Sequence, residues 1–353
     1  MKRFAVPALK LLVIGLLVWY MAHTIRSGDL HLEKLQGIRE HWPWMLLAQL
    51  FSGGALVLTF WRFRLLLLAQ GIRYSLREAV ALGFVGFFFN QFTPGSTGGD
   101  LVKAFYVAME HRERRAAGVT TVFLDRIVGV LALVALAAIS ALFNRDRIAS
   151  SEALSYLAFV IAGLLAGTLL GASIFFSGRV RRSAIVQAIA RKIPFRKLVM
   201  QVQGSIYLYR HHPGLVLAVL GISLLVQLCL VGMVYSFARA LGENAVQLGA
   251  FFFVVPLGML AMAIPTGSPG GLGQSEFAFD TLFRQASGYP YGFLLALLHR
   301  LSWYAWALLG LIPYLRRRKR VDEARRLVAE ENAEKEKSDA ETAGRACRAD
   351  DRV

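Results

Sequence analysis

The chain has 353 residues, of which 56% are hydrophobic, whereas an ordinary soluble domain is about 45–50% apolar even when glycine is counted. Its mean hydropathy of +0.49 reflects long apolar runs, which exclude a soluble globular protein and predict an all-α, polytopic membrane protein. The formal net charge is +17, although residues 316–353 hold 12 Lys/Arg and 10 Asp/Glu. The positive excess therefore belongs to the hydrophobic body, which favours cytoplasmic loops facing anionic lipid over a nucleic-acid partner.

Six apolar runs are each long enough to cross a hydrocarbon core of about 30 Å. They are residues 4–24, 43–61, 117–143, 153–177, 214–238 and 291–315. The first run resembles a signal peptide, but its length and the interruption at Lys10 favour a retained span.

Two further segments, 79–109 and 247–284, begin apolar, break at a Gly/Pro-rich stretch and resume for too short a distance to cross back. We interpret them as re-entrant hairpins, with eight simple spans as the alternative. The basic loops that flank the spans place both termini in the cytoplasm of a bacterial inner membrane, and the two hairpins then enter from opposite faces.

Two polar regions complete the predicted organisation. Residues 178–197 carry seven Lys/Arg and no acidic residue, with apolar residues on one helical face, so we expect a helix lying on the lipid surface. Residues 1–315 form the predicted transmembrane domain, and 316–353 form a charged, partly disordered cytoplasmic tail. Cys229 and Cys347 lie in an apolar run and in the tail, so no disulfide, metal site or cofactor is expected.

The two hairpins contain an internal repeat. Residues 95–99 and 267–271 share the pattern Gly-Ser-x-Gly-Gly, and a charged pair follows each copy: Asp125-Arg126 and then His299-Arg300. Asp125 and Arg300 each lie nine residues into their span, about 14 Å deep at 1.5 Å per residue. Because the two spans begin at opposite faces, both residues arrive close to the middle of the membrane, and the repeat is of the inverted kind found in transporters.

Charges at this depth must face protein, water or a ligand. Asp125 and Arg126 are adjacent, hence about 100° apart around the helix, and cannot satisfy each other. We expect Asp125 to pair with Arg300 or with Arg126 of a neighbouring surface. For Arg126 the candidates are Asp100, Glu276 or an anionic ligand. Structural ion pairs that only hold helices together are the alternative.

The glycine-rich breaks have a second possible use, because exposed N–H groups at a restarting helix form an anion site. A phosphate head group would fit there, with Arg126 or Arg300 as a bidentate partner, although a closely packed turn explains the glycines equally well. Lys103 could neutralise Asp100 or reach the phosphate. In contrast, we interpret Gln227 as structural, and the aromatic and basic run 60–64 as an interfacial anchor.

These motifs resemble those of the lysylphosphatidylglycerol synthase transmembrane-region family. Residues 90–103 read Asn-x-x-x-Pro-Gly-x-x-Gly-Gly-Asp-x-x-Lys, and residues 265–276 read Pro-x-Gly-Ser-Pro-Gly-Gly-Leu-Gly-x-x-Glu. The similarity covers nearly all of residues 1–315, and the family includes the flippase domain of bifunctional synthases as well as stand-alone flippase-like proteins. The resemblance places Asn90, Asp100, Lys103, Asp125, Arg126, Glu276 and Arg300 at a translocation site. Lys103 departs from the arginine that is frequent there. The sequence lacks the soluble aminoacyl-transferase part, so we do not expect it to make an aminoacylated lipid.

The leading hypothesis is a lipid flippase that moves an anionic phospholipid or a polyprenyl-phosphate-linked lipid between leaflets. No nucleotide-binding loop or hydrolase motif occurs, so we expect no enzyme activity. The alternatives are a membrane enzyme acting on a lipid phosphate and a non-transporting partner of a lipid-synthesis enzyme. The predicted substrate-binding residues are Asn90, Ser96, Gly98, Gly99, Asp100, Lys103, Asp125, Arg126, Ser268, Gly270, Gly271, Glu276 and Arg300.

Overall fold

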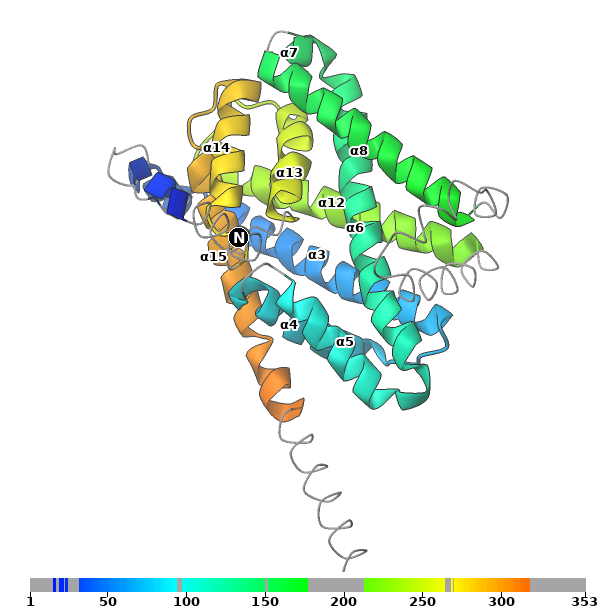
Figure 1. Ribbon diagram of the computed structural model, residues 1–353. Coiled ribbons are helices and arrows are strands. Elements are labelled where there is room, and N and C mark those ends of the chain that lie inside the picture. The colour runs from blue at the N-terminus through cyan, green and yellow to red at the C-terminus, as the bar shows by residue number, and fades with distance from the viewer. Residues whose placement is uncertain are drawn as a thin grey trace, which may run out of the picture. The chain divides into compact units, whose positions relative to one another are not determined.

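The computed structural model describes residues 15–16, 19–21, 23–24, 32–93, 97–149, 152–176, 213–263, 268 and 270–317. All regular elements in these ranges are helices (Figure 1), which confirms the predicted all-α class. Most of the run at 4–24, the basic stretch 178–197 and the tail beyond 317 lie outside the described residues, as does the predicted site residue Ser96. The chain divides into two units, Met1–Gly310 and Leu311–Val353, and the first unit holds the site.

The main helices are Trp42–Ala69 (α3), Leu76–Phe92 (α4), Gly98–Glu110 (α5), Arg115–Phe143 (α6), Glu152–Phe176 (α8), Pro213–Ala240 (α12), Leu248–Ala263 (α13), Gln274–Ser287 (α14) and Gly292–Leu308 (α15). Short helical pieces occupy Leu32–Gln36 (η1), Gly37–Glu40 (α2), Arg112–Arg114 (η2) and Arg145–Ala149 (α7). The helical stretches Trp42–Ala69, Arg112–Phe143, Gly214–Ala240 and Gly292–Arg317 are long and apolar enough to cross a membrane. They match four of the predicted spans, and the described part of the run 153–177 belongs to the continuous 25-residue helix α8, Glu152–Phe176.

The first predicted hairpin is the helix pair α4–α5, which lie side by side in Figure 1. Gly86 contacts Lys103, and Gly99 contacts both Gly86 and Asn90, so residues further back on α4 meet residues further along α5 and the helices are antiparallel. A Cβ atom on Gly99 would lie 1.7 Å from the Gly86 carbonyl oxygen. The backbones therefore touch, which no other residue at position 99 would permit. The helix α4 begins with a capping box between Ser75 and Glu78.

The second predicted hairpin, α13–α14, is antiparallel as well. Gly258 packs against Phe279, and the Gln274 side chain donates from Nε2 to the Ala261 carbonyl oxygen at 3.2 Å. A Cβ atom on Gly258 would lie 2.2 Å from the Phe279 ring, so here too a glycine lets the helices approach closely. Both hairpins thus form as helix pairs, while their entry from opposite membrane faces stays a prediction.

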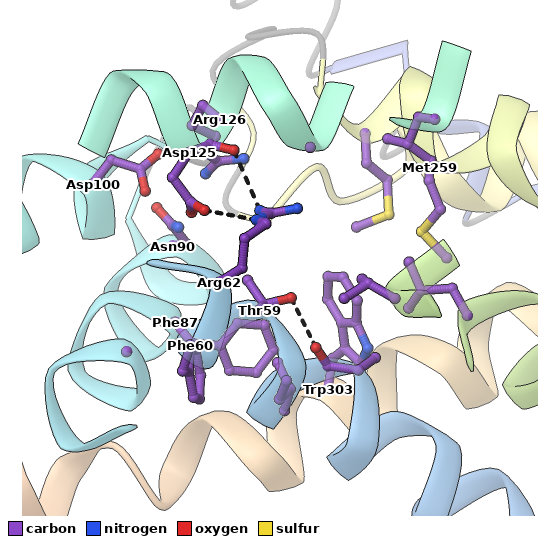
Figure 2. Close-up of a pocket in the computed structure, with 18 of the residues that line it drawn as sticks. Thr59, Phe60, Arg62, Phe87, Asn90, Asp100, Asp125, Arg126, Met259 and Trp303 are labelled. Carbon is purple, nitrogen blue, oxygen red and sulfur yellow. Dashed lines mark hydrogen bonds and ion pairs between the residues drawn. The ribbon is translucent and has the colours of Figure 1, made fainter. Parts of the chain in front are cut away.

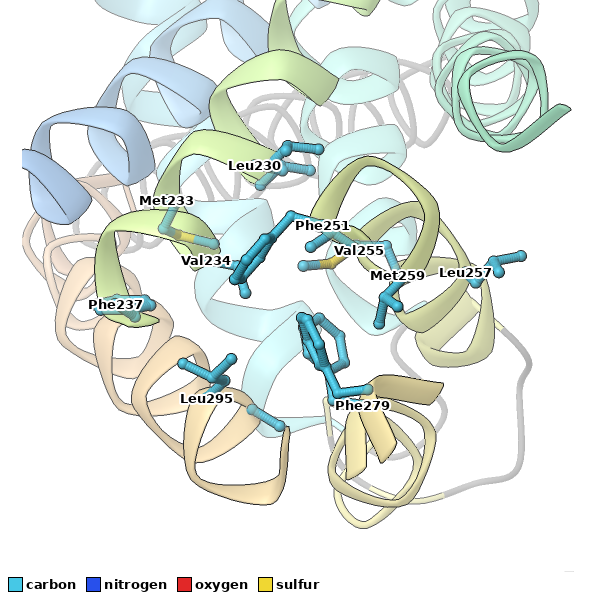
Figure 3. Packing of buried hydrophobic residues seen from close by; sticks show 14 of the residues in the cluster. Leu230, Met233, Val234, Phe237, Phe251, Val255, Leu257, Met259, Phe279 and Leu295 are labelled. Atoms are coloured by element: carbon cyan, nitrogen blue, oxygen red, sulfur yellow. The ribbon is translucent and has the colours of Figure 1, made fainter. Parts of the chain in front are cut away.

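An apolar cluster joins the second hairpin to the long helices α12 and α15 (Figure 3). Phe251 and Phe279 from the hairpin face Val234 of α12 and Leu295 of α15, and all four side chains are at least 98% buried. Lipid tails are as apolar as these side chains, so close packing and polar contacts hold such helices together more than the hydrophobic effect does. Large apolar side chains such as Phe143 are exposed at the surface, as expected where helices face lipid.

Candidate functional site

A cavity of about 250 Å³ lies between α3, α4, α5, α6, α12, α13 and α15. Its charged lining residues are Arg62, Asp100, Lys103, Asp125 and Arg126. Figure 2 shows Asp100, Asp125, Arg126 and Arg62 gathered on one side of this cavity and Met259 with Trp303 on the other. The other lining residues are Ala55, Leu56, Thr59, Phe60, Gly83, Phe87, Asn90, Gln91, Gly129, Val130, Leu133, Val226, Gln227, Leu230, Met262 and Gly270. The cavity is therefore amphipathic, with three cations and two carboxylates at its polar side.

Asp125 on α6 pairs with Arg62 on α3. The Arg62 Nε donates to Asp125 Oδ1 at 2.8 Å, and its terminal nitrogens donate to the Asp125 carbonyl oxygen at 3.3 Å and to Ser223 Oγ on α12 at 3.1 Å. The predicted pairing of Asp125 with Arg300 is therefore wrong, and so is the interpretation of Arg62 as an interfacial anchor. Both errors have one cause: α3 continues to Ala69, beyond the predicted end of this span at 61, and carries Arg62 into the interior.

Asp100 lies at the third residue of α5 and contacts two cations. Its Oδ1 lies 3.1 Å from the Lys103 Nζ, and its Oδ2 accepts from the Arg126 Nε. The Lys103 ammonium also lies 5.1 Å from the centroid of the Phe63 ring, a cation–π contact. Asp100 was one of the predicted partners of Arg126. The Arg126 side chain remains 44% exposed, so this ion pair stands at the edge of the buried network.

In the second hairpin, Glu276 occupies the same position as Asp100, the third residue of its helix, and pairs with Arg300 on α15. The Arg300 guanidinium also donates to the Gly270 carbonyl at 3.2 Å, to the Gly271 carbonyl at 2.9 Å and to Ser275 Oγ at 2.7 Å. The side chains of Arg300 and Glu276 are 4% and 0% exposed. The predicted pairing of Glu276 with Arg126 is wrong, because each arginine binds the carboxylate of its own hairpin.

The repeat seen in the sequence therefore extends to the side-chain contacts. In each copy, an acidic residue near the start of the hairpin's second helix binds an arginine on the next helix, 26 residues later in the first copy and 24 in the second. The two hairpins also meet: a Cβ atom on Gly270 would lie 2.9 Å from the Gln91 carbonyl oxygen at the end of α4. The two hairpins, each with its own ion pair between an acidic residue and an arginine, are thus in contact with each other.

Two glycine N–H groups at these breaks have side-chain acceptors within the chain. Gly99 N donates to Asn90 Oδ1 at 2.8 Å, and Gly273 N donates to Glu276 Oε2 at 2.8 Å. In this conformation these two N–H groups therefore bind the protein's own side chains. Gly270 and Gly271 have φ values of +55° and +69°, in the left-handed region that favours glycine, so both are needed for the turn.

The structure brings six of the predicted site residues together in the cavity: Asn90, Asp100, Lys103, Asp125, Arg126 and Gly270. The other predicted residues that the structure describes do not line it: Gly98 packs against Thr93, and Gly99, Ser268, Gly271, Glu276 and Arg300 belong to the packed hairpin contacts. Sequence reasoning missed Arg62, Thr59 and Trp303, and it assigned Gln227 a structural role although Gln227 lines the cavity. The signal for Arg62 in the sequence was the apolar run 65–69, which continues the helix beyond this arginine.

The family model described as Lysylphosphatidylglycerol synthase TM region matches residues 8–311. The chain belongs to this family. Among the curated proteins, no match was found. Membership of the lysylphosphatidylglycerol synthase TM region family, together with the apolar helices, identifies a multi-pass membrane protein of lipid metabolism or transport.

Proposed function

We propose that this protein is a lipid flippase that carries the anionic head group of a membrane lipid through the cavity between leaflets. The observation that carries the proposal is the set of three cations and two carboxylates around one cavity among membrane helices. Unbalanced charges in a membrane cost a few kcal/mol or more. The formal charge of this lining is +1, so a singly negative head group would neutralise it.

The size of the cavity favours a head group over a whole lipid. About 250 Å³ is somewhat less than the roughly 300–1,000 Å³ of pockets that enclose a drug-sized ligand. The acyl chains would stay in the bilayer, and the apolar side with Met259 and Met262 would accommodate the carbons nearest the phosphate. A lipid with a large glycan head group would not fit without rearrangement.

The carboxylates support a binding role more than an enzymatic one. Asp100, Asp125 and Glu276 each bind an arginine, so all three carboxylates are engaged in ion pairs, which favours a role in holding and positioning cations. We therefore propose a non-enzymatic transporter, located in a bacterial inner membrane with both termini in the cytoplasm. A lipid-synthesis enzyme that supplies or consumes the lipid is the proposed partner.

The test is leaflet exchange in proteoliposomes. A membrane-impermeant quencher reports how fast a fluorescent lipid moves between the leaflets. The labelled lipids are phosphatidylglycerol, phosphatidic acid, a polyprenyl phosphate and, as the neutral control, phosphatidylcholine. We expect faster exchange of at least one anionic lipid and a loss of tenfold or more, on the order of one charge-assisted contact, in Arg126→Gln. Arg284→Gln is the matched control, since this arginine is 43% exposed and pairs with Asp280 away from the cavity.

Two results would contradict the proposal: no acceleration of any anionic lipid, or equal losses in Arg126→Gln and Arg284→Gln. Mass spectrometry of the same vesicles addresses the enzyme alternative, because a lipid of altered mass formed only by the wild type would favour it.

A further inference from the structure

We propose that Asp100 occupies the place of the substrate's phosphate, and that a phosphate oxyanion binds by displacing the Asp100 carboxylate from Lys103 and Arg126. This inference rests on the proposed function and deepens it, because it names the anion-binding atoms and confines them to the first copy of the repeat. The ligand chemistry is a phosphate oxyanion, whether it belongs to a lipid head group or to free phosphate.

The first argument is the bridging geometry. The two Asp100 oxygens lie on different cations, Oδ1 at 3.1 Å from the Lys103 Nζ and Oδ2 on the Arg126 Nε. Two oxygens of a phosphate can bridge a lysine and an arginine in the same way, because both anions offer neighbouring acceptors to charged donors. The carboxylate thus marks where an incoming oxyanion would sit.

The second argument is access. Asp100, Lys103 and Arg126 all line the cavity, and the Arg126 side chain is 44% exposed. A ligand can therefore approach these cations without unfolding a helix. A carboxylate attached to the start of α5 needs only a side-chain rotation to leave them.

The third argument is the contrast with the second copy. Arg300 is 4% exposed, Glu276 is fully buried, and neither lines the cavity. Arg300 also donates to the Gly270 and Gly271 carbonyls, which hold it in place. Displacing Glu276 would leave a buried charge without a partner, which is strongly unfavourable. In the first copy of the repeat a ligand can therefore replace the Asp100 carboxylate, whereas in the second copy the Glu276 carboxylate stays bound to Arg300.

Competition by Asp100 has a use in transport. A site that conducts must bind well enough to admit the ligand and weakly enough to release it. With Asp100 present, release of the phosphate is compensated by return of the carboxylate to the same cations. Removing the carboxylate should therefore tighten binding and slow release.

The test measures anion affinity in detergent-purified full-length protein by titration calorimetry. The probes are dihexanoyl phosphatidic acid and inorganic phosphate, and the variants are Asp100→Asn and Asp280→Asn. The control is matched in burial, because Asp280 is 10% exposed beside Arg284 at 43%, as Asp100 is 10% exposed beside Arg126 at 44%. We expect Asp100→Asn to bind about tenfold more tightly, as for removal of one competing charge-assisted contact, and Asp280→Asn to bind like the wild type.

Unchanged or weaker binding in folded Asp100→Asn would overturn the inference, and so would an equal gain in Asp280→Asn. If Asp100→Asn does not fold, Lys103→Gln provides the second test: weaker anion binding supports the displacement, and unchanged binding overturns it. A gain for phosphatidic acid identifies a lipid head group as the source. A gain for inorganic phosphate alone supports the anion site but contradicts the lipid flippase. Absence of leaflet exchange together with a gain in affinity would likewise contradict only the proposed function.

Discussion

Removal of the Arg300 side chain should strongly destabilise the fold, because it breaks a buried ion pair. In Arg300→Leu, the fully buried Glu276 carboxylate loses its cation, and the Gly270 and Gly271 carbonyls lose their donor. Breaking a buried pair from one side costs about 3–5 kcal/mol. By comparison, Arg126→Leu should cost roughly 0–1 kcal/mol, the range for solvent-exposed pairs, because Arg126 is 44% exposed and Asp100 keeps Lys103 as a partner.

The double variant separates the charge from the rest of the contact network. Replacing both Arg300 and Glu276 by leucine removes the uncompensated charge, so the double variant should lose about 0.5–3 kcal/mol less than the sum of the two single losses, the usual size of coupling between contacting residues. Recovery should be incomplete, because the two glycine carbonyls still lack their donor.

Equilibrium unfolding in mixed detergent and dodecyl sulfate, followed by tryptophan fluorescence, measures these free energies. The reasoning fails if Arg300→Leu unfolds within about 1 kcal/mol of the wild type, well below the cost of a broken buried pair. It also fails if the double variant loses the sum of the two single losses, because the residues would then not be coupled.

Three further outcomes are expected. Gly99→Ala should destabilise by about 1–3 kcal/mol or more, through a clash between backbones. Gly221→Ala should be neutral or stabilising, because among the described residues no atom outside its own helix backbone lies within 4 Å of the new methyl group. Thermal unfolding in detergent compares the two, and equal effects would contradict the packing. Arg62→Leu should cost about 3–5 kcal/mol, because it leaves a buried carboxylate of α6 without its arginine; a loss below about 1 kcal/mol in dodecyl sulfate unfolding, as for a surface pair, would exclude this network. In a chain without its native cysteines, an impermeant maleimide should label His111→Cys only from the cytoplasmic side and Ser287→Cys only from the outer side, and external labelling of position 111 would exclude the first re-entrant hairpin.

The breaks in the fold could be predicted because glycine and proline act locally. The runs around Gly99 and Gly271 interrupt apolar segments, and each lies where one helix of a hairpin gives way to the next. Spans could be predicted for a similar reason, since length and hydropathy are properties of a continuous stretch. The repeat pointed to Arg126 and Arg300 as equivalent residues, and their contacts with equivalent carboxylates follow the same spacing.

The pairing between distant helices could not be predicted in the same way. Arg62 and Asp125 are 63 residues apart, and their contact depends on α3, α6 and α12 packing together. The run 60–64 has the composition of an interfacial belt, so the predicted span ended at residue 61, whereas the helix continues to Ala69. Local composition cannot show whether such an arginine meets water or a buried aspartate, because that depends on the neighbouring helix.

The contact between Gly270 and the end of α4 has a mechanical consequence. Gly270 lies against both the backbone and the side-chain oxygen of Gln91 at this point, so a shift of one hairpin against the other either pushes on its neighbour or exposes polar groups to the membrane interior. We therefore expect the motions of the two hairpins to be coupled, so that opening on one face of the membrane accompanies closing on the other. Spin labels on both hairpins should then report correlated distance changes, whereas independent changes would show that the motions of the two hairpins are not coupled.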